Sequence, residues 1–293
     1  MATSFSGTGV ALVTPFQADL SVDFRALSAL IDHVISNGVS YLVALGTTAE
    51  TPTLSETEKK QVLAHIIKHN AGRVPVVCGM GGNNTADVVQ QLQSWDLTGV
   101  AGILSVSPYY NKPTQEGIYQ HFKAIAAATK LPVILYNVPG RTSGNILPAT
   151  AVRLARELSN VVAIKEASGN MAQCMELVLT APQDFEVLSG DDDLVVPQVA
   201  IGFKGVISVA ANCYTRDFTT MVQAALDGNF ITARQLHYKL LKGTGLLFAE
   251  GNPAGVKCVL QQMNICANVL RLPLVAVSPA TEQALATELQ KMK

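Results

Sequence analysis

Charged side chains are scarce in this sequence. Asp, Glu, Lys and Arg make up 15% of the 293 residues, against about 25% in typical globular domains. The two signs nearly cancel, with 21 basic and 22 acidic residues and a formal net charge of −1. No basic stripe or block of like charge occurs. We therefore expect no nucleic-acid partner and no attachment to a membrane surface.

Cysteine pairs and long apolar runs are missing as well. The five cysteines are scattered and form no Cys-x-x-Cys pair, which indicates free thiols in a reducing, cytoplasmic compartment. No Cys and His residues have the spacing of zinc ligands, so we expect no metal. No apolar stretch reaches the roughly 18 residues of a membrane helix. We also recognise no signal or transit peptide.

The sequence does contain a regular alternation of short apolar runs and longer amphipathic segments. Hydrophobic residues make up 48% of the chain, enough for a large core. The short runs are rich in Val, Ile and Leu and apolar on both faces, which is typical of parallel strands covered by helices. We expect eight strands, at residues 10–16, 41–46, 75–81, 102–108, 132–138, 161–167, 185–191 and 205–211.

Segments with helical periodicity fill the intervals between these strands. One helix start is marked by Ser55 with Glu58 three residues later, the pattern of a capping box. The predicted helices of the alternating part are residues 24–36, 55–69, 84–97, 115–128, 147–158, 171–180, 193–200 and 215–227.

Two α/β architectures accept this alternation: a closed (β/α)8 TIM barrel and an open doubly wound sheet. Eight strand–helix units within about 215 residues fit the barrel. An open dinucleotide-binding sheet needs Gly-x-Gly-x-x-Gly between a strand and a helix. GMGGNN at 79–84 lacks that spacing, and GTGV at 7–10 precedes the expected first strand. We therefore favour the barrel.

Beyond the eighth unit the pattern changes to helices alone. Residues 230–248, 254–262 and 279–290 are predicted helices, with no strand between them. No low-complexity linker precedes them, so we expect this C-terminal extension to pack on the barrel. We divide the chain into a barrel domain, residues 1–228, which carries the active site, and a C-terminal helical domain, residues 229–293.

Lys165 is the residue that most strongly suggests chemistry. It follows four apolar residues inside an expected strand, and lysine is rarely buried without a reason. Burial disfavours the charged form of an amine, and a neutral amine attacks carbonyl carbon, as Schiff-base lysines do. The alternative is an ion pair with Glu166 or with an acid on a neighbouring strand. The strand pattern alone supports both interpretations equally, whereas the other lysines are expected mainly on helix faces and in loops.

Further polar side chains are expected at the same end of the barrel, where active sites of this fold lie. Tyr136 ends the neighbouring strand and is a candidate general acid or base. Thr47 and Thr48 offer hydroxyl and backbone N–H groups for a carboxylate or a proton relay. Arg141 is a candidate for holding a substrate carboxylate at the mouth. Taken singly, each has a structural alternative: a core tyrosine, a threonine turn or an exposed arginine.

Six motifs occur together in a recognisable order: GTTAE (46–50), SPYYNKPTQEG (107–117), YNVPGRT (136–142), AIKEASGN (163–170), LSGDD (188–192) and GVISVAAN (205–212). In this order they resemble the dihydrodipicolinate synthase family of class I pyruvate-dependent aldolases and lyases. The resemblance covers essentially the whole chain. The arginine of YNVPGRT is the element that points to this family within the wider group.

The resemblance implies a role for four catalytic residues. Lys165 forms an imine with pyruvate, and Tyr136 is the acid or base beside it. Thr47 links Tyr136 to Tyr110 in a proton relay, with Tyr110 supplied by an adjacent subunit.

The resemblance also implies the substrate-binding residues. Thr48 holds the pyruvate carboxylate, and the backbone around Gly190 and Ile207 lines the pocket. Arg141 binds the carboxylate of L-aspartate 4-semialdehyde, the second substrate.

The activity implied is a lyase of the diaminopimelate route to lysine, without metal or organic cofactor, in a homotetramer built as a dimer of dimers. Two other enzymes of the group, N-acetylneuraminate lyase and 2-keto-3-deoxy sugar-acid aldolase, keep Lys165 and Tyr136 but take another second substrate. Arg141 is the residue that separates them from the family. A non-catalytic barrel is a further alternative, but it would typically lose the lysine or the relay.

Two positions depart from the family pattern. Ala49 stands where glycine is common, which is tolerable if its φ is negative. Glu56 and Lys59 stand where lysine-sensitive members have histidines. Lys59 would place a like charge near a bound lysine ammonium, so we expect weak or absent inhibition by L-lysine.

Overall fold

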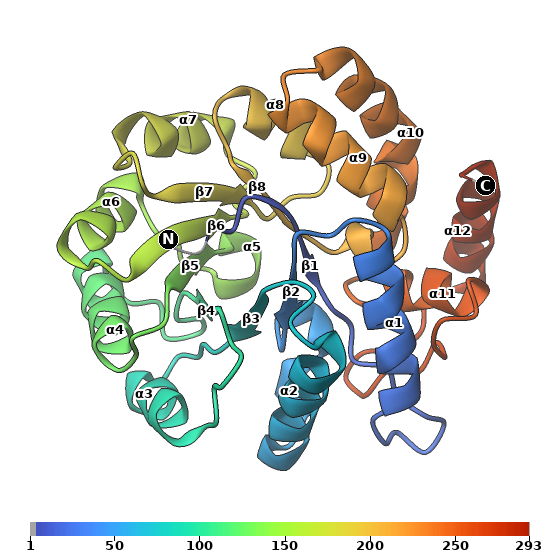
Figure 1. Ribbon diagram of the computed structural model, residues 1–293, viewed down its shortest axis with the longest axis horizontal. Helices are drawn as coiled ribbons and strands as arrows, with labels where there is room; N and C mark the ends of the chain where they lie inside the picture. The colour runs from blue at the N-terminus through green and yellow to red at the C-terminus, as the bar shows by residue number, and fades with distance from the viewer. Residues whose placement is uncertain (1–3, 293) are drawn as a thin grey trace.

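Eight parallel strands close into a barrel in the order of the chain (Figure 1), as seen in a computed structural model that describes residues 4–292. β8 pairs with β1 and so completes the closure. The prediction of a (β/α)8 TIM barrel rather than an open sheet is confirmed. The strands are β1 (Gly7–Ala11), β2 (Tyr41–Ala44), β3 (Val76–Gly79), β4 (Gly102–Val106), β5 (Val133–Asn137), β6 (Val161–Glu166), β7 (Glu186–Ser189) and β8 (Gly205–Ser208).

Helices follow the strands and form the outer ring of the barrel. The capping box predicted at Ser55 is present: its hydroxyl accepts from Glu58 N at 3.2 Å, and Glu58 Oε2 accepts from Ser55 N at 2.8 Å. The ring consists of α1 (Phe24–Ser36), α2 (Glu56–Asn70), α3 (Thr85–Ser94), α4 (Gln115–Ala127), α6 (Pro148–Glu157), α7 (Met171–Thr180), α8 (Val195–Ala200) and α9 (Thr215–Leu226). Short helices in the loops are η1 (Thr47–Ala49), η2 (Thr51–Thr53), α5 (Pro139–Thr142) and η3 (Ala210–Asn212).

The first strand lies earlier in the chain than expected. The structure places it at Gly7–Ala11, so the prediction of residues 10–16, with GTGV ahead of the strand, is wrong. The glycines belong to the strand because of a close approach: a Cβ at Gly9 would lie 2.2 Å from the ring of Tyr41. Pro15, by contrast, has no N–H to donate to a neighbouring strand.

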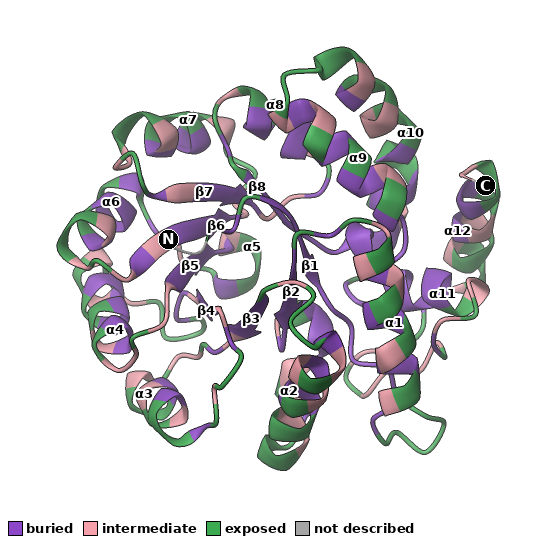
Figure 2. Ribbon diagram, in the orientation of Figure 1, coloured by how far each residue is buried: buried purple, intermediate pink, exposed green. Residues whose placement is uncertain are grey.

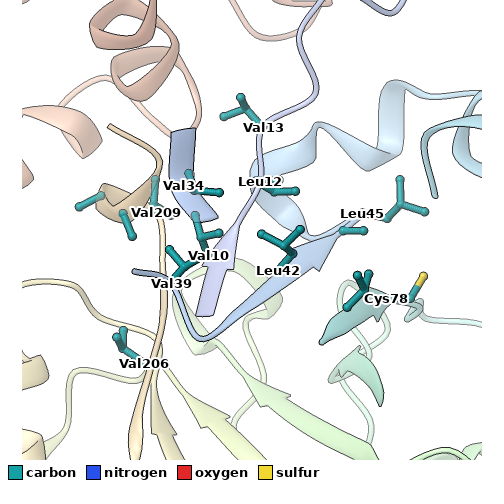
Figure 3. Close-up of a cluster of buried hydrophobic side chains, with 14 of the residues drawn as sticks. Val10, Leu12, Val13, Val34, Val39, Leu42, Leu45, Cys78, Val206 and Val209 are labelled. Atoms are coloured by element: carbon teal, nitrogen blue, oxygen red, sulfur yellow. The ribbon is translucent and has the colours of Figure 1, made fainter. Parts of the chain in front are cut away.

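Apolar side chains fill two layers, one inside the barrel and one between the strands and the helices. In Figure 2 most of the strand ribbon has the colour of buried residues, while the helices are buried along one face only. Successive side chains of a strand point to opposite faces of the sheet. In β1 and β2, Val10 and Leu42 therefore point outward toward Val34 of α1 (Figure 3), whereas Val43 points inward. The helical ring is held by this outer layer.

The C-terminal helices are α10 (Phe230–Phe248), α11 (Ala254–Gln262) and α12 (Pro279–Lys291). They lie together on one side of the barrel (Figure 1), where α10 packs on α8 and α9, and α11 packs on η3. Leu247 and Val256 belong to the same buried cluster as the outer layer of the barrel. The extension packs on the barrel as expected, while the domain division after residue 228 stays a prediction. Within residues 4–292, no helix is long and apolar enough to cross a membrane.

Candidate active site

A cavity of about 700 Å³ lies at the end of the barrel where the strands terminate. Loops after seven of the strands contribute to its wall, together with two residues of the C-terminal helical part. The lining includes Leu45, Gly46, Thr47, Thr48, Lys59, Gly79, Met80, Tyr109, Tyr136, Val138, Arg141, Lys165, Ala167, Gly190, Asp191, Val209, Phe248 and Asn252.

Lys165 points into this cavity from β6. It lies two residues after Ala163, which faces the barrel interior, so its side chain lies on the same face. Parallel pairing sets Lys165 beside Tyr136 of β5, and Lys165 Nζ lies 4.4 Å from the centroid of the Tyr136 ring. Only 5% of Lys165 is exposed. Among residues 4–292, no carboxylate lies within ion-pair distance of its amine.

Glu166, the ion-pair partner considered in the structural alternative for Lys165, has other partners. Its carboxylate accepts from Asn137 Nδ2 at 2.9 Å, from Gln173 Nε2 at 3.2 Å and from Ser168 N at 2.7 Å. Neighbouring side chains of a strand point to opposite faces, so Glu166 faces away from the cavity. The structural interpretation of Lys165 as half of an ion pair with Glu166 is therefore wrong.

Gly190, which follows β7, makes room for the Lys165 side chain. A Cβ at this position would lie 3.0 Å from Lys165 Cε and 2.5 Å from the Cβ of Ala167. The second distance is far inside van der Waals contact, so any larger residue must displace a neighbour. The glycine therefore leaves the space that the lysine stem occupies beside the cavity.

The loop after β2 carries the two threonines in a tight double turn. η1 and η2 follow each other directly, and Glu50 between them has a left-handed φ of 54°. Ala49 is not among the positive-φ residues, so the departure from glycine is tolerated as expected. Thr51 Oγ1 closes the turn by donating to Gly46 O at 2.8 Å.

The two threonines of this loop differ in their surroundings. Thr47 is exposed, whereas Thr48 is buried. Thr48 Oγ1 accepts a hydrogen bond of 3.0 Å from Asn252 Nδ2, which comes from the C-terminal helical part. The wall of the cavity is thus shared between the barrel and its extension.

Lys257 of α11 is fully buried, although the sequence analysis placed lysines outside β6 mainly at the surface. Its Nζ lies 2.5 Å from Glu50 Oε1, donates to Val269 O at 2.8 Å and stands 4.2 Å from the centroid of the Phe16 ring. Glu50 Oε2 in turn accepts from Arg271 N at 3.0 Å. This ion pair ties the threonine loop to the C-terminal extension.

Asp191 adds a carboxyl group to the cavity wall. Burial raises its pKa to about 6, and the neighbouring Asp193 contributes in the same direction. The hydrogen bond from Gly169 N and the charge of Lys165 oppose that shift. Within the part of the chain that the structure describes, no three His, Cys, Asp or Glu residues are grouped so that they could hold a metal ion.

The remaining predicted site residues, Arg141, Tyr110 and Ile207, differ in their exposure and in their position relative to the cavity. Arg141 lies in α5, exposed at the cavity wall. Tyr110 is 89% exposed and outside the lining of the cavity. Ile207 is fully buried in the barrel interior with Tyr136. Within the described range, residues 4–292, no hydrogen bonds join Tyr136, Thr47 and Tyr110 into a relay.

Comparison with known proteins identifies the family of this chain. Residues 4–292 match the model of the dihydrodipicolinate synthetase family. The chain belongs to this family. It is 52% identical over 275 residues, 94% of each chain, to a 4-hydroxy-tetrahydrodipicolinate synthase of Flavobacterium psychrophilum. It is 49% identical over 289 residues to one of Parabacteroides distasonis, covering 99% of this chain and 97% of the other.

A solved structure of the family superposes closely. The dihydrodipicolinate synthase of Aquifex aeolicus shares 43% sequence identity, with a TM-score of 0.95 and coverage of 98% of each chain. The family assignment inferred from the motifs is confirmed.

Two of the lining residues that were not predicted from the sequence come from the C-terminal helical part. Phe248 and Asn252 lie beyond the eighth unit, where no strand end marks a position at the mouth of the barrel. The only sequence signal in this segment is the dipeptide Asn252-Pro253, which favours a turn between two helices. Their proximity to Thr48 depends on tertiary packing.

Proposed function

We propose that this chain condenses pyruvate with L-aspartate 4-semialdehyde, the reaction of 4-hydroxy-tetrahydrodipicolinate synthases, which are lyases of the diaminopimelate route to lysine. The observation that carries the proposal is Lys165: it is buried at a cavity, without a carboxylate partner among residues 4–292, beside the ring of Tyr136. Family membership over nearly the whole chain supports the same reaction.

The first half of the reaction forms the enamine. The Lys165 amine attacks the keto carbon of pyruvate, and water leaves as the C=N bond forms. Loss of a proton from the pyruvate methyl carbon then gives the enamine, with Tyr136 as the group that moves protons. The imine nitrogen accepts the electron pair, so the lysine itself performs the role of an electron sink.

The second half forms two bonds. The enamine carbon attacks the aldehyde carbon of the semialdehyde, whose oxygen takes up a proton. The amino nitrogen of the semialdehyde then attacks the imine carbon, closes the ring and releases the Lys165 amine. In this scheme Arg141 binds the semialdehyde carboxylate, and Thr48 donates to the pyruvate carboxylate. The backbone around Gly190 and Ile207 borders the pyruvate.

Trapping with borohydride tests the proposal directly. The protein is incubated with pyruvate and borohydride, and the modified peptide is mapped by mass spectrometry. We expect a reduced pyruvyl adduct on Lys165 and none on Lys257, which is fully buried and whose amine is held by Glu50 and Val269 O. A protein that forms no adduct with pyruvate overturns the proposal.

The identity of the second substrate has its own test. Arg141→Ala should lower turnover of L-aspartate 4-semialdehyde roughly 100-fold, because a charge-assisted carboxylate contact is lost, while the pyruvate adduct still forms. In a second assay, the unchanged protein is given sugar aldehydes, and their turnover is compared with that of the semialdehyde. Faster turnover of a sugar aldehyde than of the semialdehyde would point to a sugar-acid aldolase.

The proposal includes a homotetramer, a dimer of dimers, in the cytoplasm. Large apolar side chains are exposed on α7 (Leu179, 84%), on α10 (Ile231, 67%; Tyr238, 66%) and in the loop after β4 (Tyr110). Exposed apolar side chains of this size can be covered when subunits associate. In the proposed dimer, Tyr110 of one copy completes the relay of Tyr136 and Thr47 in the other. Light scattering measures the assembly, and five buried, unpaired cysteines suit a reducing compartment.

Inhibition by L-lysine is proposed to be weak or absent. Lys59 and Tyr109 both contribute to the cavity wall, and a lysine ammonium bound beside Lys59 would meet a like charge. Turnover measured against increasing L-lysine tests this point, and a submillimolar inhibition constant would contradict it.

A further inference from the structure

Asn252 combines burial, a position at the active-site cavity and a single protein partner for its side chain. It lies between α10 and α11, is 7% exposed and contributes to the cavity wall. Its Nδ2 donates to Thr48 Oγ1 at 3.0 Å. Its Oδ1 is buried and accepts no hydrogen bond from residues 4–292.

We propose that Asn252 is a positioning residue for pyruvate, which acts by directing the hydroxyl proton of Thr48 toward the substrate carboxylate. The inference rests on the proposed function, because it assumes that Thr48 contacts pyruvate. It assigns part of the active site to the C-terminal helical extension, which the sequence motifs of the barrel do not reach.

The hydrogen-bonding capacity of a threonine hydroxyl explains this role. The hydroxyl has one proton to donate and two lone pairs that accept. Asn252 Nδ2 occupies one of the lone pairs, and it is the only partner of Thr48 Oγ1 among residues 4–292. The proton therefore points away from Asn252. It stays available to a carboxylate in the cavity, oriented before the substrate arrives.

The Asn252 side chain makes no hydrogen bond to the described chain other than the one to Thr48, which distinguishes a positioning residue from a residue that stabilises the fold. A buried asparagine that stabilises a fold usually satisfies both its oxygen and its nitrogen. Asn137 is such a residue, with hydrogen bonds to Glu166, Asn145 and the N–H of Ile146. The side chain of Asn252 hydrogen-bonds to Thr48 alone in the described chain, so its removal should affect Thr48 before it affects the fold.

The backbone of Asn252 is held in place by the neighbouring ion pair. Lys257 lies in α11, which starts two residues after Asn252, and Glu50 lies two residues after Thr48. The contact between Lys257 and Glu50 therefore joins the same two segments as the hydrogen bond between Asn252 and Thr48. This arrangement fixes the distance between the amide and the hydroxyl.

The test compares Asn252→Ala and Asn252→Asp with the unchanged protein. We expect a roughly 3- to 10-fold rise in the pyruvate KM for Asn252→Ala, the effect of one hydrogen bond. The KM for the semialdehyde and kcat at saturating pyruvate should change far less. Asn252→Asp should weaken pyruvate binding more, because a carboxylate accepts the Thr48 proton and repels the substrate.

A double-mutant cycle shows whether Asn252 acts through Thr48. When Thr48→Val has removed the hydroxyl, Asn252→Ala should raise the pyruvate KM no further. Asn160→Ala is the control, because it removes partly buried hydrogen bonds to Ala126 O and Thr129 O before the start of β6, at the end of that strand away from Lys165, and it should leave the pyruvate KM unchanged.

Three results would overturn the inference: an unchanged pyruvate KM in Asn252→Ala, equal rises for both substrates, or additive effects in the cycle. A failure of the proposed function is distinguishable, because the unchanged protein would then form no borohydride-trapped pyruvate adduct at Lys165. If the adduct forms with the same pyruvate dependence in Asn252→Ala and in the unchanged protein, only the role of Asn252 is lost.

Discussion

Two lysines are buried, Lys165 in the wall of the active-site cavity and Lys257 in α11, and they differ in their partners. Lys257 is fully buried, paired with Glu50 and hydrogen-bonded to Val269 O. Lys165 is 5% exposed, and no carboxylate among residues 4–292 neutralises it. Burial lowers the pKa of Lys257, and the charge of Glu50 opposes that shift.

The comparison shows that burial alone does not make a lysine reactive. A lysine nucleophile needs an amine that is not held by protein acceptors and space for the approaching carbon. Lys165 has both, since its amine faces a cavity of about 700 Å³ and has no hydrogen-bond or ion-pair partner among residues 4–292. Lys257 has neither, because it is fully buried and Glu50 and Val269 O hold its amine. We therefore assign the chemistry to Lys165 and a structural role to Lys257.

The largest expected effect comes from Lys165→Arg, which keeps the charge but removes the nucleophilic amine. Turnover should fall by on the order of 10⁴-fold or more, as for the loss of other covalent nucleophiles. The check is steady-state turnover together with borohydride trapping, which should find no adduct. Near-normal turnover, or an adduct that moves to Lys257, would reverse the assignment of the two lysines.

Lys257→Met should lower the stability of the fold and leave imine formation at Lys165 intact. It leaves the Glu50 carboxylate buried without its partner, which costs about 3–5 kcal/mol of the free energy of unfolding. Urea unfolding measures this loss, and trapping should still label Lys165 in the fraction that folds. The double variant Lys257→Met with Glu50→Gln is the control, because removing both charges should recover much of the stability. No loss in the single variant would argue against an ion pair.

The difference between the two lysines was only partly predictable from the sequence. Lys165 sits in a short apolar run of a βα repeat, so the strand pattern places it at the catalytic end of a barrel. Lys257 sits in a helix, where periodicity does not show that its face is covered by the threonine loop. That loop is about 200 residues away along the chain.

Features that depend on local sequence were predictable, whereas features of the fold and the site that depend on contacts between remote residues were not. Helices such as α1 and α7 begin and end at the predicted residues, because their boundaries depend on local caps and periodicity. β1 was misplaced because its glycines are required by the ring of Tyr41, a contact between strands. Asn252 was missed for the same kind of reason, since its partner Thr48 is remote in sequence.

Gly190→Ala sharpens the comparison by disturbing the space around one lysine only. The added methyl would lie 3.0 Å from Lys165 Cε and 2.5 Å from Ala167 Cβ, so the lysine stem must move. Imine formation should slow roughly 10- to 100-fold, because small displacements of a reacting group are costly. The measurement is the rate of adduct formation at fixed pyruvate. Gly140→Ala is the control, since a Cβ there meets no atom within 4 Å, and an equal effect in both variants would remove the steric explanation.

The smallest expected effect lies in the pH dependence of stability, which reports the charge of Lys165 through Asp191. The pKa of Asp191 is about 6 in the fold against 3.8 in the ordinary group, so the folded state binds more protons between these values. Its contribution to stability therefore falls as pH rises from about 4 to about 6 and is constant above.

Since Lys165 lowers this pKa, Lys165→Met should extend the fall above pH 6, by roughly 0.5–1 kcal/mol of the free energy of unfolding. Lys257 is not among the groups that shift Asp191, so Lys257→Met should leave the pH range unchanged although the protein is less stable throughout. Urea unfolding between pH 4 and pH 8 distinguishes the two variants, with Asp191→Asn in each background to remove the titrating group. If both lysine variants shift the range equally, the two amines do not differ in how they act on the cavity.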